Sequence, residues 1–158
     1  MVATAMGSPF APSYANIFMD AIEKRILTTA PRGDIPLMWV RFIDDIYAIW
    51  THGLIKLQEF YNHMNSIHQT IKFEMEYSHE KISFLDTMTI FNKENNSITT
   101  TLYKKPTDIC SLLHAESFHP NSCKKGIIYS QALRYRRIIS DDVNFETHLN
   151  VLLQTLIK

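Results

Sequence analysis

Two adjacent aspartates, Asp44 and Asp45, are the residues of this chain whose type and spacing best suit metal-ion chemistry. They separate two apolar runs, residues 37–43 and 46–50, whose aromatic and β-branched content predicts the strands of a hairpin. Asp-Asp is a poor two-residue turn, because such turns favour Gly or Asn and because like charges repel. Adjacent carboxylates on a rigid hairpin can bind a divalent cation, and a third carboxylate would complete a two-metal site. An exposed acidic turn without a function is the alternative interpretation.

A basic segment is the second candidate site. Residues 38–103 contain five Lys or Arg and eight Asp or Glu, whereas residues 104–137 contain seven Lys or Arg and two acidic residues. Basic side chains in such a segment can follow a phosphate backbone through salt-sensitive contacts that do not read sequence. A solvated basic face is the alternative. The seven basic residues are Lys104, Lys105, Lys124, Lys125, Arg134, Arg136 and Arg137.

Four potential zinc ligands, Cys110, His114, His119 and Cys123, lie within fourteen residues. Sites with two Cys and two His usually pair their ligands more regularly and have a longer loop between the pairs. We therefore do not expect zinc here. Two cysteines in the whole chain do not make a disulfide-stapled scaffold, and they fit a reducing, intracellular compartment.

Length and composition bound the class of protein. A chain of 158 residues, 46% of them hydrophobic, can bury one compact core but not two full domains. The formal net charge of zero excludes a histone-like binder, and the ordinary apolar content excludes a highly charged disordered chain. No stretch approaches the roughly 20 apolar residues of a membrane span, so we expect no membrane partner.

Two helices are predicted in the first half of the chain. Ser8 suits the N-cap and Pro9 the first position of a helix that carries one apolar face from Tyr14 to Ile26. Apolar residues at helical spacing predict a second amphipathic helix over residues 54–67.

Antiparallel strands are predicted next. Alternating apolar residues favour one strand over residues 71–77 and another over 82–90. Residues 92–97 are typical of a turn, and a return strand follows at 98–102. Together these elements predict an α+β fold in which helices lie on one face of an antiparallel sheet.

The end of the chain has a different pattern, which predicts a basic helix at 124–139 and an amphipathic helix at 145–156. We place a boundary near Lys105, so that residues 1–105 and 106–158 form two parts. Two helices joined by a short turn also resemble a helix-turn-helix unit.

Ordered sequence strings resemble those of a reverse transcriptase. Residues 6–16 look like the family's glycine-serine-proline motif, and residues 42–45, Phe-Ile-Asp-Asp, look like its aromatic-x-Asp-Asp motif. The resemblance covers nearly the whole chain. Four further strings resemble those of the Penelope-like retroelement branch of this family, which is related to telomerase reverse transcriptase. They are residues 82–87, 101–108, 117–120 and 129–134.

The resemblance implies roles for the matching residues. Asp44 would be a catalytic metal ligand and Asp45 would support the metals, with two Mg2+ ions in the complete enzyme. Gly7, Ser8 and Pro9 would lie near the incoming nucleotide and the template. Five of the basic residues would belong to a thumb that grips the primer–template duplex: Lys124, Lys125, Arg134, Arg136 and Arg137. The implied partners are an RNA template, a DNA primer and deoxynucleoside triphosphates, and the implied location is the nucleus.

The resemblance also implies a partial right-hand polymerase palm followed by an all-α, thumb-like tail. The family's earlier palm aspartate and its fingers have no counterpart in the sequence, so we expect this chain to be inactive alone as an RNA-directed DNA polymerase. The alternative is a non-catalytic nucleic-acid-binding remnant that uses its helix-turn-helix-like basic tail. A thumb should bind duplexes with little sequence preference, whereas a regulator should prefer one site.

Overall fold

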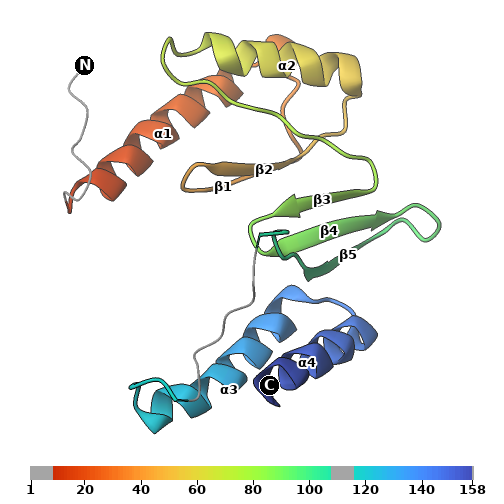
Figure 1. The fold of residues 1–158 in the computed structure, drawn as a ribbon. Coiled ribbons are helices and arrows are strands. Elements are labelled where there is room, and N and C mark those ends of the chain that lie inside the picture. Colours follow the sequence, from red (N-terminus) through yellow and green to blue (C-terminus); the bar gives the residue numbers. More distant parts are fainter. Residues whose placement is uncertain (1–8, 108–115, 158) are drawn as a thin grey trace. The chain divides into compact units, whose positions relative to one another are not determined.

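The computed structural model describes residues 9–107 and 116–157, which form two compact units, Met1–Glu76 and Tyr77–Lys158 (Figure 1). Within the described residues there are four α-helices and two small antiparallel sheets, so the predicted mixture of helices and antiparallel strands is confirmed. A palm and a thumb are not confirmed by this arrangement. None of the helices in the described part of the chain is long and apolar enough to cross a membrane.

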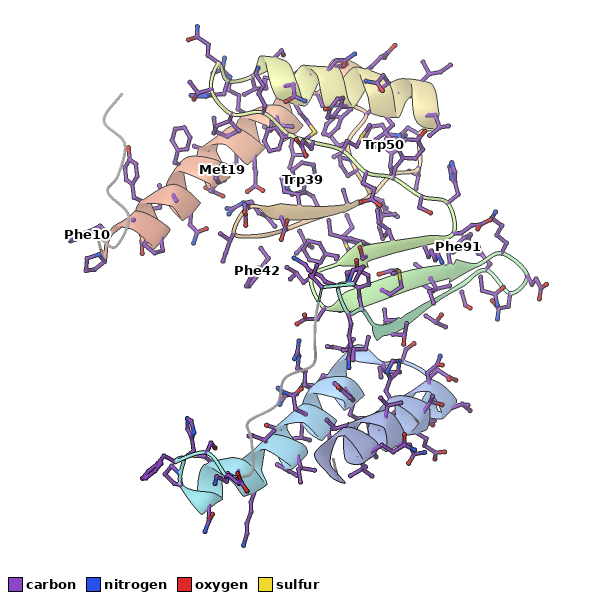
Figure 2. The ribbon with its side chains drawn as sticks, viewed as in Figure 1. Phe10, Met19, Trp39, Phe42, Trp50 and Phe91 are labelled. Atoms are coloured by element: carbon purple, nitrogen blue, oxygen red, sulfur yellow. The ribbon has the colours of Figure 1, made fainter. Side chains whose placement is uncertain are left out.

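The first unit packs two helices against a hairpin. Its core contains Ile22, Ile26 and Phe60, and half-buried Trp39 and Trp50 pack against them. Figure 2 shows Trp39 on the side of the hairpin that faces the helices, whereas Phe42 lies on its other side. The elements are α1 Ala11–Thr28, the short 3-10 helix η1 Pro31–Gly33, β1 Met38–Phe42, β2 Asp45–Ile49 and α2 Leu54–Ser66.

The first helix begins later than its sequence predicts. Helix α1 starts at Ala11 after an N-cap residue, Phe10, that makes no side-chain cap hydrogen bond. Pro12, rather than Pro9, lies in the first turn, where a missing N–H leaves no intrahelical bond unmade. The predicted cap, Ser8, lies outside the described residues.

The turn of the first hairpin also differs from the prediction. Phe42 pairs with Asp45, so the two-residue loop is Ile43-Asp44 and not Asp44-Asp45. Ile43 has a φ of 56°, a conformation that a β-branched residue rarely adopts. Positive φ at the first loop residue is typical of a type II′ turn, which matches the twist of the flanking strands.

No strand forms over residues 71–77, so this prediction is wrong. Ile71 and Phe73 still turn toward the core, which explains their alternation with polar residues. The Asn65 side chain takes the place of a neighbouring strand. Its Oδ1 accepts a hydrogen bond from Phe73 N at 2.7 Å, and its Nδ2 donates to Phe73 O at 3.2 Å.

The second unit contains a three-stranded sheet with the order β3-β4-β5. The single strand predicted over residues 82–90 is two strands, because a turn at Leu85-Asp86 divides it and pairs Phe84 with Thr87. Leu85 has a φ of 52°, so it repeats the conformation of Ile43. The predicted return strand is confirmed. The strands are β3 Lys81–Phe84, β4 Thr87–Asn92 and β5 Ser97–Leu102.

Two helices, α3 Asn121–Ile138 and α4 Asp142–Ile157, pack on β5. The segment between them is anchored to the sheet, because Thr100 N donates to Ser140 Oγ at 2.9 Å and Ser140 N donates to Thr100 O at 3.0 Å. The predicted boundary between residues 105 and 106 stays a prediction. The core of this unit consists of Leu102, Tyr135, Ile139 and Leu152, with Ile138, Phe145 and Leu149 packed around it.

Candidate functional site

The two hairpin carboxylates lie in different positions. Asp44 is the second loop residue, whereas Asp45 is the first residue of β2 and lies opposite Phe42. Both side chains are exposed. The two carboxylates are therefore adjacent in sequence and accessible to solvent.

Arg41 fixes the hairpin tip to helix α1. Its Nη1 donates to Asn16 Oδ1 at 3.0 Å and to Ile43 O at 2.9 Å. Its Nε lies 3.0 Å from Glu23 Oε1, and this ion pair is largely buried. Trp39 Nε1 donates to the same Glu23 oxygen at 2.9 Å. The carbonyl of Ile43 thus accepts a hydrogen bond from a guanidinium that is itself bound to Asn16 and Glu23 of α1.

These carboxylates do not form a two-metal site by themselves. Among the described residues, no three His, Cys, Asp or Glu side chains lie close enough together to hold a metal ion. Two-metal chemistry needs ligands that clamp both ions, and two exposed carboxylates do not provide them. Catalysis by Asp44 and Asp45, and their binding of Mg2+, stay predictions. Pro9 is exposed next to α1, while Gly7 and Ser8 lie outside the described residues.

The structure describes two of the four potential zinc ligands, for which no zinc is expected. Cys110 and His114 lie outside the described residues, and His119 and Cys123 are exposed at the start of α3.

Helix α3 concentrates the positive charge of the second unit. It contains five Lys or Arg and no Asp or Glu, whereas α4 contains Asp142 and Glu146 and no Lys or Arg. Lys104 and Lys105 follow β5 and are exposed. The sheet and both helices therefore position all seven predicted basic residues in the same unit.

Arg134 and Arg136 of α3 are paired with carboxylates. Arg134 forms an ion pair with Asp86, at the turn between β3 and β4. Arg136 forms an ion pair with Asp142 at the start of α4, and its guanidinium lies 5.1 Å from the centre of the Phe145 ring. These carboxylates reduce the charge that Arg134 and Arg136 present to a polyanion.

An exposed stripe runs along the outer face of α3. Lys125, Tyr129, Leu133 and Arg137 recur every four residues, and all four are exposed. Tyr129 retains 69% of its accessible surface. Residues four apart on a helix are neighbours on one face, so the stripe places an aromatic and an aliphatic side chain between two cations. Tyr129 and Leu133 were not among the predicted site residues, although their four-residue spacing from Lys125 is visible in the sequence.

His148 lies where α4 meets β5. Its Nε2 is 3.3 Å from Thr101 Oγ1. Its ring packs edge-on against the Tyr135 ring, with 6.2 Å between the two ring centroids. Burial lowers the pKa of His148 below its usual 6.5, and the positive charge of Lys104 lowers it further. The neutral imidazole is therefore the form that fits this packing.

A comparison with family models matches residues 111–158 to an animal helix-turn-helix domain. The match contains α3 and α4 and covers less than a third of the chain. No curated protein matches the chain, and no solved structure matches it.

The resemblance to Penelope-like reverse transcriptases is wrong. The comparisons find a helix-turn-helix domain and no reverse transcriptase family. The structure gives a reason why residues 42–45 resemble the aromatic-x-Asp-Asp motif of that family. Phe42-Ile43-Asp44 and Phe84-Leu85-Asp86 both form hairpin turns with positive φ at the aliphatic residue. In this chain, an aromatic residue, an aliphatic residue and Asp are thus a turn pattern that occurs twice.

Proposed function

We propose that this chain is a non-catalytic nucleic-acid-binding protein that binds duplex DNA through its second unit. The observation that carries the proposal is the helix-turn-helix match over a helix, α3, that has five basic and no acidic residues. Helix-turn-helix domains dock on DNA with one helix in or against the major groove. A helix with this charge gains affinity from neutralised phosphates.

The distribution of charge supports this proposal better than the total charge does. The chain is neutral overall, so it has no general attraction to polyanions. Local attraction at α3 then favours one orientation on the duplex, since α1 and α4 do not share its excess of positive charge. The anchoring of Ser140 to Thr100 holds α3 and α4 in a fixed geometry on the sheet.

The proposal is tested by fluorescence anisotropy with the full chain and a labelled duplex of about 20 base pairs. We expect binding at 50 mM salt and a steep loss of affinity at 200 mM, because bound phosphates release counterions. An RNA–DNA hybrid serves as a competitor that separates duplex binding in general from a preference for DNA. Absence of binding at 50 mM salt, with the chain folded by circular dichroism, contradicts the proposal.

A further inference from the structure

We propose that α3, and not α4, is the helix that contacts DNA, through phosphate contacts made by the stripe of Lys125, Tyr129, Leu133 and Arg137. This inference rests on the function proposed above and names the surface that performs it. In helix-turn-helix proteins, the second helix of the pair usually enters the major groove and reads bases with its first residues. The second helix here is α4, and its properties oppose that role.

The charge of α4 is unfavourable for insertion into a groove. Its first turns carry Asp142 and Glu146, both exposed, and no Lys or Arg occurs along the helix. Carboxylates at the point of entry face phosphates on both sides of the groove, and like charges repel. The Asp142 carboxylate pairs with Arg136, but the Glu146 side chain remains exposed to solvent.

Helix α4 instead serves the core of its unit. Leu152 is buried, and Phe145 and Leu149 pack against the same cluster as Tyr135 and Ile139 of α3. Its apolar face is thus covered by the sheet and by α3, which is the usual role of a packing helix.

The stripe on α3 has a size that suits a groove. Lys125 and Arg137 are twelve positions apart, which corresponds to a rise of about 18 Å along the helix. The major groove is about 12 Å wide, so the two long side chains can reach phosphates on its opposite walls. Tyr129 and Leu133, between them, then face the groove or the sugars and supply apolar contact.

The two paired arginines lie outside this stripe. Arg134 is held by Asp86 and Arg136 by Asp142, so each already has a carboxylate in place of a phosphate. The stripe also has no Asn or Gln, the side chains that commonly read adenine. With Lys125 and Arg137 extended to phosphates on the two walls of the groove, the contacts made by the stripe are directed to the backbone of the duplex and do not read its sequence.

The test compares two exposed pairs in the full chain. The first variant is Lys125→Gln with Arg137→Gln, and the matched control is Asn144→Ala with Asn150→Ala on α4. We expect the first variant to lower the slope of log affinity against log salt by about two, because each phosphate contact contributes about one. We expect the control to stay within about twofold of the unmodified chain.

The outcomes separate the inference from the proposed function. Loss of affinity in the α4 variant, or an unchanged salt slope in the α3 variant, overturns the inference while leaving DNA binding intact. No binding by the unmodified chain overturns the proposed function itself. If the double variant fails to fold by circular dichroism, the single variants Lys125→Gln and Arg137→Gln replace it, each with an expected slope change of about one.

Discussion

At the scale of single residues, Ile43 is held in a conformation that suits Gly better. Its φ is 56° and its side chain is 65% exposed, so a change to Gly relieves strain and removes little packing. We expect Ile43→Gly to raise the free energy of unfolding by about 1 kcal/mol. Urea denaturation measures the effect, and Ile43→Ala, which keeps the unfavourable φ, is the control. A lower stability for the Gly variant contradicts this account of the turn.

We expect Asp142 to compete with bound DNA for Arg136. Its carboxylate pairs with that guanidinium at the end of α3, and both side chains are exposed. We therefore expect Asp142→Asn to tighten duplex binding by roughly twofold at low salt, with less effect at high salt because exposed charges are screened. Anisotropy titrations at two salt concentrations measure the change. Asp20→Asn, at an exposed ion pair on α1, makes the same change in charge and should leave affinity unchanged.

At the scale of elements, Asn65 fixes an extended segment that lacks a neighbouring strand. Its amide makes two hydrogen bonds to the backbone of Phe73, and Lys72 Nζ donates to Asn65 O at 2.6 Å. Because Asn65→Ala leaves half-buried backbone groups unpaired, we expect it to lower the free energy of unfolding by about 1–3 kcal/mol. The control is Asn62→Ala on the exposed side of α2. Equal urea midpoints for the two variants would count against this role of Asn65.

We expect the junction of α4 with β5 to be sensitive to pH through His148. Folding lowers the pKa of His148, so the unfolded chain binds a proton at a higher pH than the folded chain does. The contribution of neutral His148 to stability is present above the usual value of 6.5 and is lost as the pH falls below it. We expect urea midpoints to decrease from pH 7 to pH 5, and His148→Gln to decrease less steeply. Parallel decreases in the two proteins contradict the assignment.

Sequence patterns predict helices here better than strand boundaries. The apolar faces of α1 and α2 extend over several turns, so an error at one residue hardly shifts them. The strand pattern fails where a different structure gives the same alternation. Apolar and polar residues alternate over 71–77 because one side of this extended segment packs on the core. They alternate over 82–90 because the turn within this range has two loop residues, which preserve the two-residue period of the strands.

The candidate interface was only partly predictable for a similar reason. The basic residues of α3 are visible in the sequence, and so is their absence from α4. The pairing of Arg134 with Asp86 is not visible in the sequence, because the two residues lie 48 positions apart. Asp86 also lies in a turn that the alternating pattern of residues 82–90 does not reveal. Tertiary contacts thus decide which cations remain available to a polyanion.

At the scale of the whole molecule, affinity and specificity are expected to have different origins. The chain is neutral, α3 carries five basic and no acidic residues, and α4 carries two carboxylates and no Lys or Arg. A surface of this kind attracts phosphates but does not distinguish base pairs.

We expect unrelated duplexes of equal length to bind within about threefold of one another at fixed salt. Site-specific regulators typically prefer their sites by about a thousandfold or more. Competition with random-sequence duplexes measures the ratio, with a duplex of doubled length as the control for site number. A single sequence preferred by such a factor would mean that bases are read, and the contact surface would then have to include side chains beyond the α3 stripe.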